Sequence, residues 1–427
     1  MSIAQLSVAF FLQLFFILAI CRLVGWLGTR YLKQPQVVCE MIAGVILGPS
    51  LFGLLAPDLQ RLVFPPDMKG VLYVGAQFGV GLYMFLVGLG FRTDHFKSNV
   101  RNAAAVSVSG MAVPFAVAVL MTPWLMQVPG LFTESASRFH ATLFMGAAIA
   151  ITAFPMLARI IHERGLSHTA LGTLSLSAGA IDDAAAWCVL AIVLASFGAG
   201  SHVAVTAIAG GLAFAVVMIF IAPRLLAPLG RMAEREQALG RPLSPTLMSI
   251  VLMLFALSAF VADAIGLHAV FGGFLLGTVM PRGALCDQLR KTLEPFTVVV
   301  LLPMFFTYSG LNTQLTIVSD PQLLLVAMAV LAASIFAKFG ACWAAARLCG
   351  QDNRTALGIG TLMNSRGLME LIIINIGLQA GVIGPALFSM LVLMAIVTTL
   401  MASPVFEWVY GREARARGEL NALETPT

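Results

Sequence analysis

The sequence predicts an all-α polytopic membrane protein with thirteen transmembrane helices, arranged as two six-helix inverted-topology repeats with two broken crossing helices. Three observations lead to this prediction. The 427-residue chain is 59% hydrophobic and only 11% charged, whereas soluble domains carry about 25% charged residues. Apolar segments of membrane-spanning length recur along the chain, and the basic residues fall mostly on one side of them. The net charge of +5 comes from short loops between these segments, so it does not indicate a nucleic-acid partner.

Thirteen apolar segments can be read from the sequence, and most reach the roughly 17–25 residues that a helix needs to cross a bilayer. They comprise residues 5–29, 36–54, 70–91, 101–126, 139–163, 168–197, 202–229, 246–264, 266–281, 295–312, 321–347, 354–380 and 383–410. The first segment is expected to be a span and not a signal peptide, because the N-terminus has no basic region and no clear small-residue cleavage site.

The basic residues give these spans an orientation. Of the 25 lysines and arginines, only Arg61, Lys69 and Arg138 lie in connections after even-numbered spans, and Lys338 and Arg366 lie inside spans. All the others lie in connections after odd-numbered spans. Cytoplasmic loops are the ones enriched in Lys and Arg. We therefore expect the N-terminus outside and the C-terminus in the cytoplasm, in the inner (plasma) membrane of a bacterium.

Spans 1–6 and 8–13 form the two predicted repeats, and a separation of seven spans makes equivalent spans cross in opposite directions. Residues 84–93 at the end of span 3 are similar to residues 304–313 at the end of span 10. Residues 44–48 in span 2 are likewise similar to residues 273–277 in span 9. Such paired similarities favour an inverted-repeat transporter. The expected division is 1–200 for the first repeat, 201–245 for span 7 and a cytoplasmic loop, 246–410 for the second repeat, and 411–427 for a short cytoplasmic tail.

Asp182 and Asp183 stand side by side near the centre of the sixth span, in a run (167–196) with no other charge. An ionised carboxylate at that depth costs at least about 2.5–3.5 kcal/mol, and two adjacent carboxylates also repel each other. A proton or cation should therefore be shared between them, which is typical of an ion exchanger. Helical neighbours point about 100° apart. We favour Asp183 as the principal cation ligand and proton carrier, with Asp182 as a second ligand or an orienting acceptor.

Two spans are predicted to be interrupted at their centres. In span 5, Pro155 removes a backbone donor, clashes with the carbonyl of Ile151, and pushes Phe154 towards an extended conformation. This would leave free carbonyls and the Thr152 hydroxyl at mid-depth; a plain proline kink is the alternative. Paired interruptions in two halves are typical of a transporter's binding site, and their oxygen atoms suit a hard monovalent cation. Span 12, the symmetry mate of span 5, carries a polar run at its own centre: Asn364, Ser365, Arg366 and Gly367.

Lys338 in span 11 lies nine residues before Arg347, which is roughly 13 Å from the cytoplasmic end at 1.5 Å per residue. Its ammonium group cannot comfortably reach that far and needs a partner inside the protein. The Asp182/Asp183 pair at similar depth is the candidate. Burial disfavours the charged forms of both partners, while pairing favours them. A permanent structural salt bridge is the alternative, although it would need only one aspartate.

Five other charged residues of the spans are expected to be structural. Arg366 and Glu370 stand four residues apart in span 12, one helical turn, and can pair. Arg159 and Glu163 have the same spacing in span 5, and Glu40 enters span 2 near the cytoplasmic side. We expect these side chains to hold the broken helices at a fixed angle.

Five motifs occur in order along nearly the whole chain: CEMIAGVILGPS (39–50), TAFPMLAR (152–159), AIDDA (180–184), GLHAVFG (266–272) and LMNSRGLMEL (362–371). Together they resemble the monovalent cation:proton antiporter-2 family of sodium/proton and potassium/proton exchangers. The resemblance implies a thirteen-span homodimer with a sodium/proton antiporter-like fold, in which spans 3–6 and 10–13 in part form an ion-carrying bundle. It also implies that Lys338 pairs with Asp182 and Asp183 when no cation is bound, and that exchange is electrogenic.

The expected function is secondary active transport, in which Na⁺ or K⁺ is exchanged for protons by alternating access at the mid-membrane Asp182/Asp183 site. The expected partners are the cation, protons, the lipid bilayer and a second copy of the chain; no cofactor and no enzymatic activity are expected. The alternative is a sodium-coupled symporter of an organic anion on a related inverted-repeat fold, although Lys338 and Arg366 make only a small cationic cluster. An intramembrane aspartyl protease would need aspartates on different helices, and a channel would make poor use of a buried Lys–Asp pair.

Overall fold

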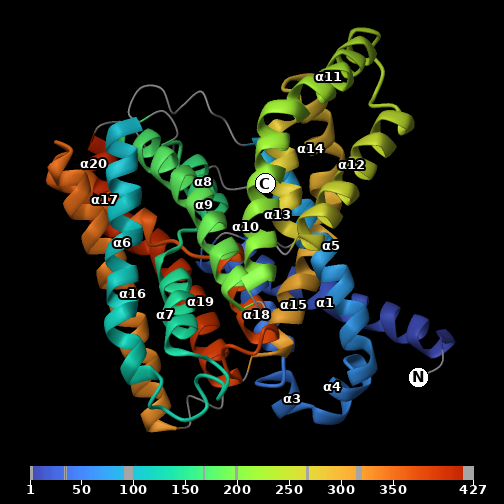
Figure 1. Ribbon diagram of the computed structural model, residues 1–427. Coiled ribbons are helices and arrows are strands. Elements are labelled where there is room, and N and C mark those ends of the chain that lie inside the picture. The colour runs from blue at the N-terminus through green and yellow to red at the C-terminus, as the bar shows by residue number, and fades with distance from the viewer. Residues whose placement is uncertain are drawn as a thin grey trace. The chain divides into compact units, whose positions relative to one another are not determined.

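The computed structural model describes residues 3–32, 34, 36–90, 100–166, 169–197, 201–265, 269–313 and 320–416 (Figure 1). Helices make up nearly all of this part of the chain, which confirms the predicted all-α class. Among the described residues, nine helices are long and apolar enough to cross a membrane. The β pairing found in these residues is one isolated bridge between Phe132 and Ile383.

The nine candidate spans correspond to nine of the thirteen predicted segments, and the remaining four have recognisable counterparts. Predicted spans 5 and 12 are each broken into two shorter helices. Span 9 corresponds to the short helix α13 (Ala269–Val279), and span 6 to α9 (Ala170–Phe197), which is 28 residues long. The total of thirteen stays a prediction.

The chain divides into two compact units. Unit 1 comprises Met1–Leu23, Ala43–Arg92 and Leu190–Leu311, and unit 2 comprises Val24–Ile42, Thr93–Val189 and Asn312–Thr427. Each unit takes helices from both predicted repeats, so the units are not the repeats themselves. Spans 3 and 10, which the family resemblance assigns in part to the ion-carrying bundle, fall in unit 1.

Unit 1 is a set of helices that cover the first and middle parts of the chain. It contains the start of α1 (Ile3–Leu32), the end of α2 (Gln36–Leu47), α3 (Phe52–Leu55), α4 (Pro57–Val63), η1 (Pro66–Met68), α5 (Lys69–Gly90), the end of α9, α10 (Ser201–Val216), η3 (Val217–Ile221), α11 (Ala222–Ala238), α12 (Pro245–Ala264), α13, α14 (Ala284–Phe296), η4 (Thr297–Leu301) and α15 (Leu302–Leu311).

Glycines bring two pairs of helices in unit 1 into backbone contact. A Cβ atom on Gly44 or Gly48 of α2 would lie 2.2 or 2.3 Å from the carbonyl oxygens of Phe306 and Gly310 on α15. Similarly, a Cβ atom on Gly277 of α13 would lie 2.2 Å from a carbonyl oxygen of α5. These glycines lie in the segments whose sequences are similar between the predicted repeats. Inverted repeats would produce such a pair of contacts, because α2 against α15 (spans 2 and 10) is the equivalent of α13 against α5 (spans 9 and 3).

Unit 2 contains the helices that carry the candidate site. They are α6 (Val100–Leu125), α7 (Arg138–Ala150), α8 (Phe154–Glu163), most of α9, α16 (Pro321–Leu348), α17 (Asn353–Met363), α18 (Leu368–Gln379), α19 (Pro385–Val409) and α20 (Gly411–Ala416). Figure 1 shows α6 and α16 running side by side. One apolar core joins α6, α8, α9, α16, α17 and α19, and its buried side chains include Leu157, Leu174, Ile359 and Phe406.

Capping residues set where several of these helices begin. Ser137 accepts a hydrogen bond from the backbone N–H of His140 at the start of α7. Asp320 accepts two backbone hydrogen bonds at the start of α16, and Asp352 accepts one from Thr355 at the start of α17. Each side chain satisfies backbone donors that have no partner within the helix.

Both predicted helix interruptions are confirmed. Helix α7 ends at Ala150 and α8 begins at Phe154, which leaves residues 151–153 outside helix. In the second half of the chain, α17 ends at Met363 and α18 begins at Leu368. Proline is tolerated in the first turn of a helix because its missing N–H would have no partner there. Pro155 therefore fits the first turn of α8 and could not continue α7.

Candidate functional site

The two interrupted helices meet at their breaks. The backbone N–H of Ala153 donates to the carbonyl oxygen of Ser365 over 3.1 Å. The Thr152 hydroxyl lies 2.9 Å from the carbonyl oxygen of Met363, where α17 ends. Backbone groups freed by one interruption are thus partly satisfied by the other. The crossing places four helix ends of unit 2 around one buried point.

Asp182 of α9 accepts hydrogen bonds from three side chains at this crossing. The Ser107 hydroxyl of α6 donates to Oδ1 over 2.6 Å. The Thr152 hydroxyl and the Lys338 ammonium group of α16 each lie 2.7 Å from Oδ2. Both members of the Lys338–Asp182 ion pair are at most 1% exposed. The carboxylate is held in position, and the lysine balances its charge.

The Thr152 hydroxyl stands between two acceptors, Asp182 Oδ2 at 2.7 Å and the Met363 carbonyl at 2.9 Å. A hydroxyl has one hydrogen and can donate to only one of them at a time. Thr152 therefore connects the break in the first half, the aspartate on α9 and the break in the second half. A change at either break or at Asp182 therefore alters which hydrogen bond the Thr152 hydroxyl can donate.

Asp183 has the opposite environment, although it is the next residue. Its side chain is fully buried, and neither carboxylate oxygen has a hydrogen-bond partner among the described residues. Asn364 Oδ1, Ser365 Oγ and Ser175 Oγ are also buried and without a partner in this part of the chain. A buried polar atom without a partner is destabilising. Asp183 and the second break thus present oxygen atoms that protons or a cation can satisfy.

Two buried cations face the carboxyl end of α7. Lys338 Nζ donates to the carbonyl of Ala150 over 2.5 Å. Arg366 donates to the carbonyls of Ala148 and Ile149, over 2.8 and 2.6 Å. The last carbonyls of a helix have no intrahelical partner and carry partial negative charge. The lysine and the arginine satisfy these groups and neutralise that end of the helix.

Arg366 also ties the second break to its surroundings. It forms the expected ion pair with Glu370 at 3.1 Å, with both side chains only 1% exposed. It donates to the Ser334 hydroxyl on α16, and its own carbonyl accepts from Thr399 on α19 over 2.6 Å. These contacts join α7, α16, α18 and α19; that Arg366 fixes the angle of the broken helix stays a prediction.

The remaining predicted residues have mixed outcomes. The side chains of Pro155, Arg159 and Glu163 lie outside the described residues. Glu40 is buried, and its Oε1 accepts from Gln36 over 2.7 Å. Among the described residues, no group of three or more His, Cys, Asp and Glu side chains could hold a metal ion.

Ser107 is the main contact that the sequence did not reveal. Serine is common in apolar spans, and nothing around it in span 4 marks it as special. Gly110, three residues later on the same face of α6, gives the one available signal. A Cβ atom there would lie 3.7 Å from Lys338 Nζ and 2.5 Å from Cys342 Sγ. A Ser–Gly pair at helical spacing therefore lets α6 approach the ion pair closely.

Comparison with known proteins gives matches along nearly the whole chain. The sequence model of the family described as "Sodium/hydrogen exchanger, transmembrane" matches residues 8–410. The chain is 37% identical to the Na(+)/H(+) antiporter NhaS4 of Synechocystis, covering 92% of this chain and 95% of that protein. It is 32% identical to K(+)/H(+) antiporter 1 of Saccharomyces cerevisiae, covering 98% of this chain and 48% of the yeast protein.

A solved structure is similar in fold. The sodium proton antiporter MjNhaP1 of Methanocaldococcus jannaschii superposes with a TM-score of 0.61, covering 92% of this chain and 97% of that one. The two sequences are 16% identical. At this identity the similarity concerns the fold, and it supports the predicted antiporter-like arrangement of helices.

Proposed function

Because the chain belongs to the transmembrane sodium/hydrogen exchanger family and is a monovalent cation/proton antiporter, we propose that exchange takes place at Asp182 and Asp183 by alternating access. Protons and one alkali cation, Na⁺ or K⁺, compete for this pair. The family match and the named relatives favour antiport over the alternative of sodium-coupled symport of an organic anion, and they indicate a transporter and not an enzyme.

The contrast between the two aspartates is the observation that carries this proposal. Lys338 neutralises Asp182, so one negative charge, that of Asp183, has no counter-charge among the described side chains of the site. Ionising a carboxylate in that position is unfavourable unless a proton or a cation is bound. Asp183 is accordingly the carrier, and it is never empty in a stable state.

The buried oxygen atoms without partners in unit 2 suit an alkali cation. The two Asp183 oxygens, Asn364 Oδ1 and Ser365 Oγ are hard ligands without partners in the described part of the chain. Such ligands favour hard cations over transition metals. Thr152 adds a hydroxyl that can turn from Asp182 to Met363. In the proposed site, residues of the second break supply ligands, while Thr152 of the first break holds Asp182 in position.

In the proposed cycle, Lys338 acts as the internal competitor of the cation. With no cation bound, its ammonium group stays on Asp182. A cation that binds both carboxylates takes over this role, and Lys338 can then release a proton. More than one proton would be exchanged per cation, which makes transport electrogenic. The proposed setting is a homodimer in a plasma membrane, with the C-terminus in the cytoplasm.

The test is replacement of Asp183 by Asn in purified protein reconstituted into liposomes. An imposed cation gradient should drive no proton flux in this variant, as measured with a pH-sensitive dye inside the vesicles. Asp263→Asn, at an exposed aspartate of unit 1, is the matched control and should keep the flux. Cation-dependent proton flux that persists in Asp183→Asn at the wild-type rate refutes the assignment.

A further inference from the structure

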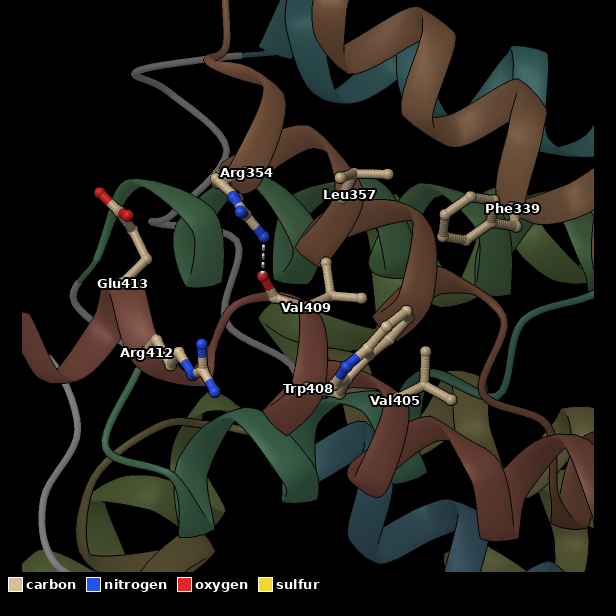
Figure 2. A pocket seen from close by; sticks show the side chains of 8 residues that line it. All are labelled: Phe339, Arg354, Leu357, Val405, Trp408, Val409, Arg412 and Glu413. Atoms are coloured by element: carbon tan, nitrogen blue, oxygen red, sulfur yellow. Dashed lines mark hydrogen bonds between the residues drawn. The ribbon is translucent and has the colours of Figure 1, made fainter.

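A hollow at one end of unit 2 has no part in the proposed exchange site. Its volume is about 550 Å³, and α16, α17, α19 and α20 all contribute to its wall. Figure 2 shows its two arginines, Arg354 of α17 and Arg412 of α20, near Trp408 of α19. The volume lies within the range of ordinary small-molecule sites, roughly 300–1,000 Å³.

The polar part of the hollow is mainly cationic. Arg354 Nη1 donates to the carbonyl of Val409 over 3.3 Å, which holds its guanidinium group at the wall. Both Arg354 and Arg412 are exposed. Glu413 also lines the hollow, and in the view of Figure 2 its carboxylate points away from the two guanidinium groups. Two arginines against one carboxylate favour an anion, and guanidinium groups match phosphate oxygens well.

The other part of the hollow is apolar. Phe339, Leu357 and Val405 line it together with Trp408. Trp408 is 82% exposed, although α19 is the most buried of the nine candidate spans in the described part of the chain. Tryptophan is typical of the level where a membrane meets water, because its ring is apolar and its N–H is polar. The hollow thus has one end that suits a phosphate group and another that suits hydrocarbon chains.

We propose that this hollow binds one anionic phospholipid, with its phosphate between Arg354 and Arg412 and its acyl chains along Trp408 and Phe339. The arginine end of the site lies where α17 begins and α19 ends, which is the height of the headgroups for helices that span a bilayer, while Phe339 lies deeper, nine residues before the end of α16. The distribution of basic residues assigns this end to the cytoplasmic side, where anionic lipids attract Lys and Arg. A free phosphate ion would use the arginines but leave the apolar wall uncovered.

The experiment measures quenching of Trp408 by brominated lipid. The full-length protein is reconstituted into phosphatidylcholine vesicles that contain a minor fraction of either brominated phosphatidylglycerol or brominated phosphatidylcholine. The Trp408 signal is the difference between the wild type and Trp408→Phe. Anionic lipid should quench it at a lower mole fraction, by about fivefold for each guanidinium group.

The double variant Arg354→Gln/Arg412→Gln should lose this preference, while Arg347→Gln should keep it. Arg347 is a matched control because it also donates to a backbone carbonyl, that of Gln351, and does not line the hollow. An unchanged unfolding temperature shows that the double variant is folded; if it is not, the single variants should each lose part of the preference.

Three results would overturn the proposal. They are equal quenching by both lipids, a preference that survives in the double variant, and loss of the preference on adding inorganic phosphate at constant ionic strength. The last result would assign the site to a soluble phosphate. None of these measurements depends on cation or proton transport, so the lipid site and the exchange site can fail separately.

Discussion

Adjacent residues on one helix can have opposite roles when their partners differ. Asp182 accepts hydrogen bonds from Ser107, Thr152 and Lys338, whereas neither Asp183 oxygen has a partner among the described residues. The Asp182 carboxylate thus has three donors and a counter-charge, whereas that of Asp183 has neither among the described residues. Removing any of the contacts of Asp182 should therefore change the pH at which a cation can compete with protons for the pair.

Ser107→Ala tests the contact that the sequence did not reveal. A hydrogen bond to a charged group contributes about 1.5–3 kcal/mol, so the activity profile should move up by about one to two pH units. The measurement is cation-driven proton flux in liposomes across a pH series. Ser109→Ala, two residues along the same helix, should leave the profile unchanged. If the pH profiles of Ser107→Ala and Ser109→Ala coincide, the hydrogen bond from Ser107 to Asp182 has no effect on exchange.

Lys338→Gln tests the competitor of the cation. Glutamine keeps a hydrogen-bond donor but removes the positive charge, so Asp182 must be neutralised by a proton or a cation instead. We expect a larger upward shift of the pH profile than in Ser107→Ala, and fewer protons exchanged per cation. Lys291→Gln, at an exposed position, is the control. If the profile and the stoichiometry do not change, Lys338 is purely structural.

At the scale of elements, the contacts between helices depend on glycines and on helix ends. Helices α5 and α13 approach so closely that a Cβ atom on Gly277 would lie 2.2 Å from the carbonyl oxygen of Phe85. Gly340 on α16 provides a contrast in the same protein, because a Cβ atom there would meet no neighbouring atom within 4 Å. Alanine substitutions at these two glycines distinguish the effect of alanine's helix propensity from the effect of crowding between helices.

Gly277→Ala should therefore destabilise the protein, whereas Gly340→Ala should be neutral or stabilise it by roughly 0.5–1 kcal/mol, because alanine favours the helix. The measurement is the unfolding temperature of the purified protein in detergent. A higher unfolding temperature for Gly277→Ala would contradict the close approach of α5 and α13.

The helix interruptions were predictable because each has a local cause. Pro155 and the polar run at Asn364 leave signals that can be read residue by residue, and both breaks lie where predicted. The nearness of Lys338 to the aspartate pair could also be inferred, since a charge buried at mid-depth needs a partner. The position of Ser107 could not, because a neutral hydroxyl needs no special partner and any span could supply it.

The division into units was not predictable from the order of segments. The sequence symmetry groups spans 1–6 and 8–13, yet each compact unit combines spans from both groups. Which helices pack together depends on how side chains fit, as where the buried Leu157, Ile359 and Phe406 meet from three helices. Periodic apolar segments carry little information about such partners, since nearly every face of a span is apolar.

At the scale of the whole molecule, the uneven distribution of basic residues predicts the orientation in the membrane. Because the connections after odd-numbered spans carry most of the 25 lysines and arginines, the C-terminus should be cytoplasmic. A green fluorescent protein fused to the C-terminus should therefore be fluorescent in bacterial cells, and an alkaline phosphatase fusion should be inactive. Active phosphatase would reverse the assignment.

The ion pair of Asp182 with Lys338 joins residues that are 156 positions apart in the chain. At about 5–20 residues per second, the ribosome makes the lysine roughly 8–30 s after the aspartate. During that interval the acidic helix must enter the lipid without its counter-ion, and it can do so cheaply only in the protonated form. A newly made chain should thus acquire its first bound proton during biosynthesis, before any transport cycle begins.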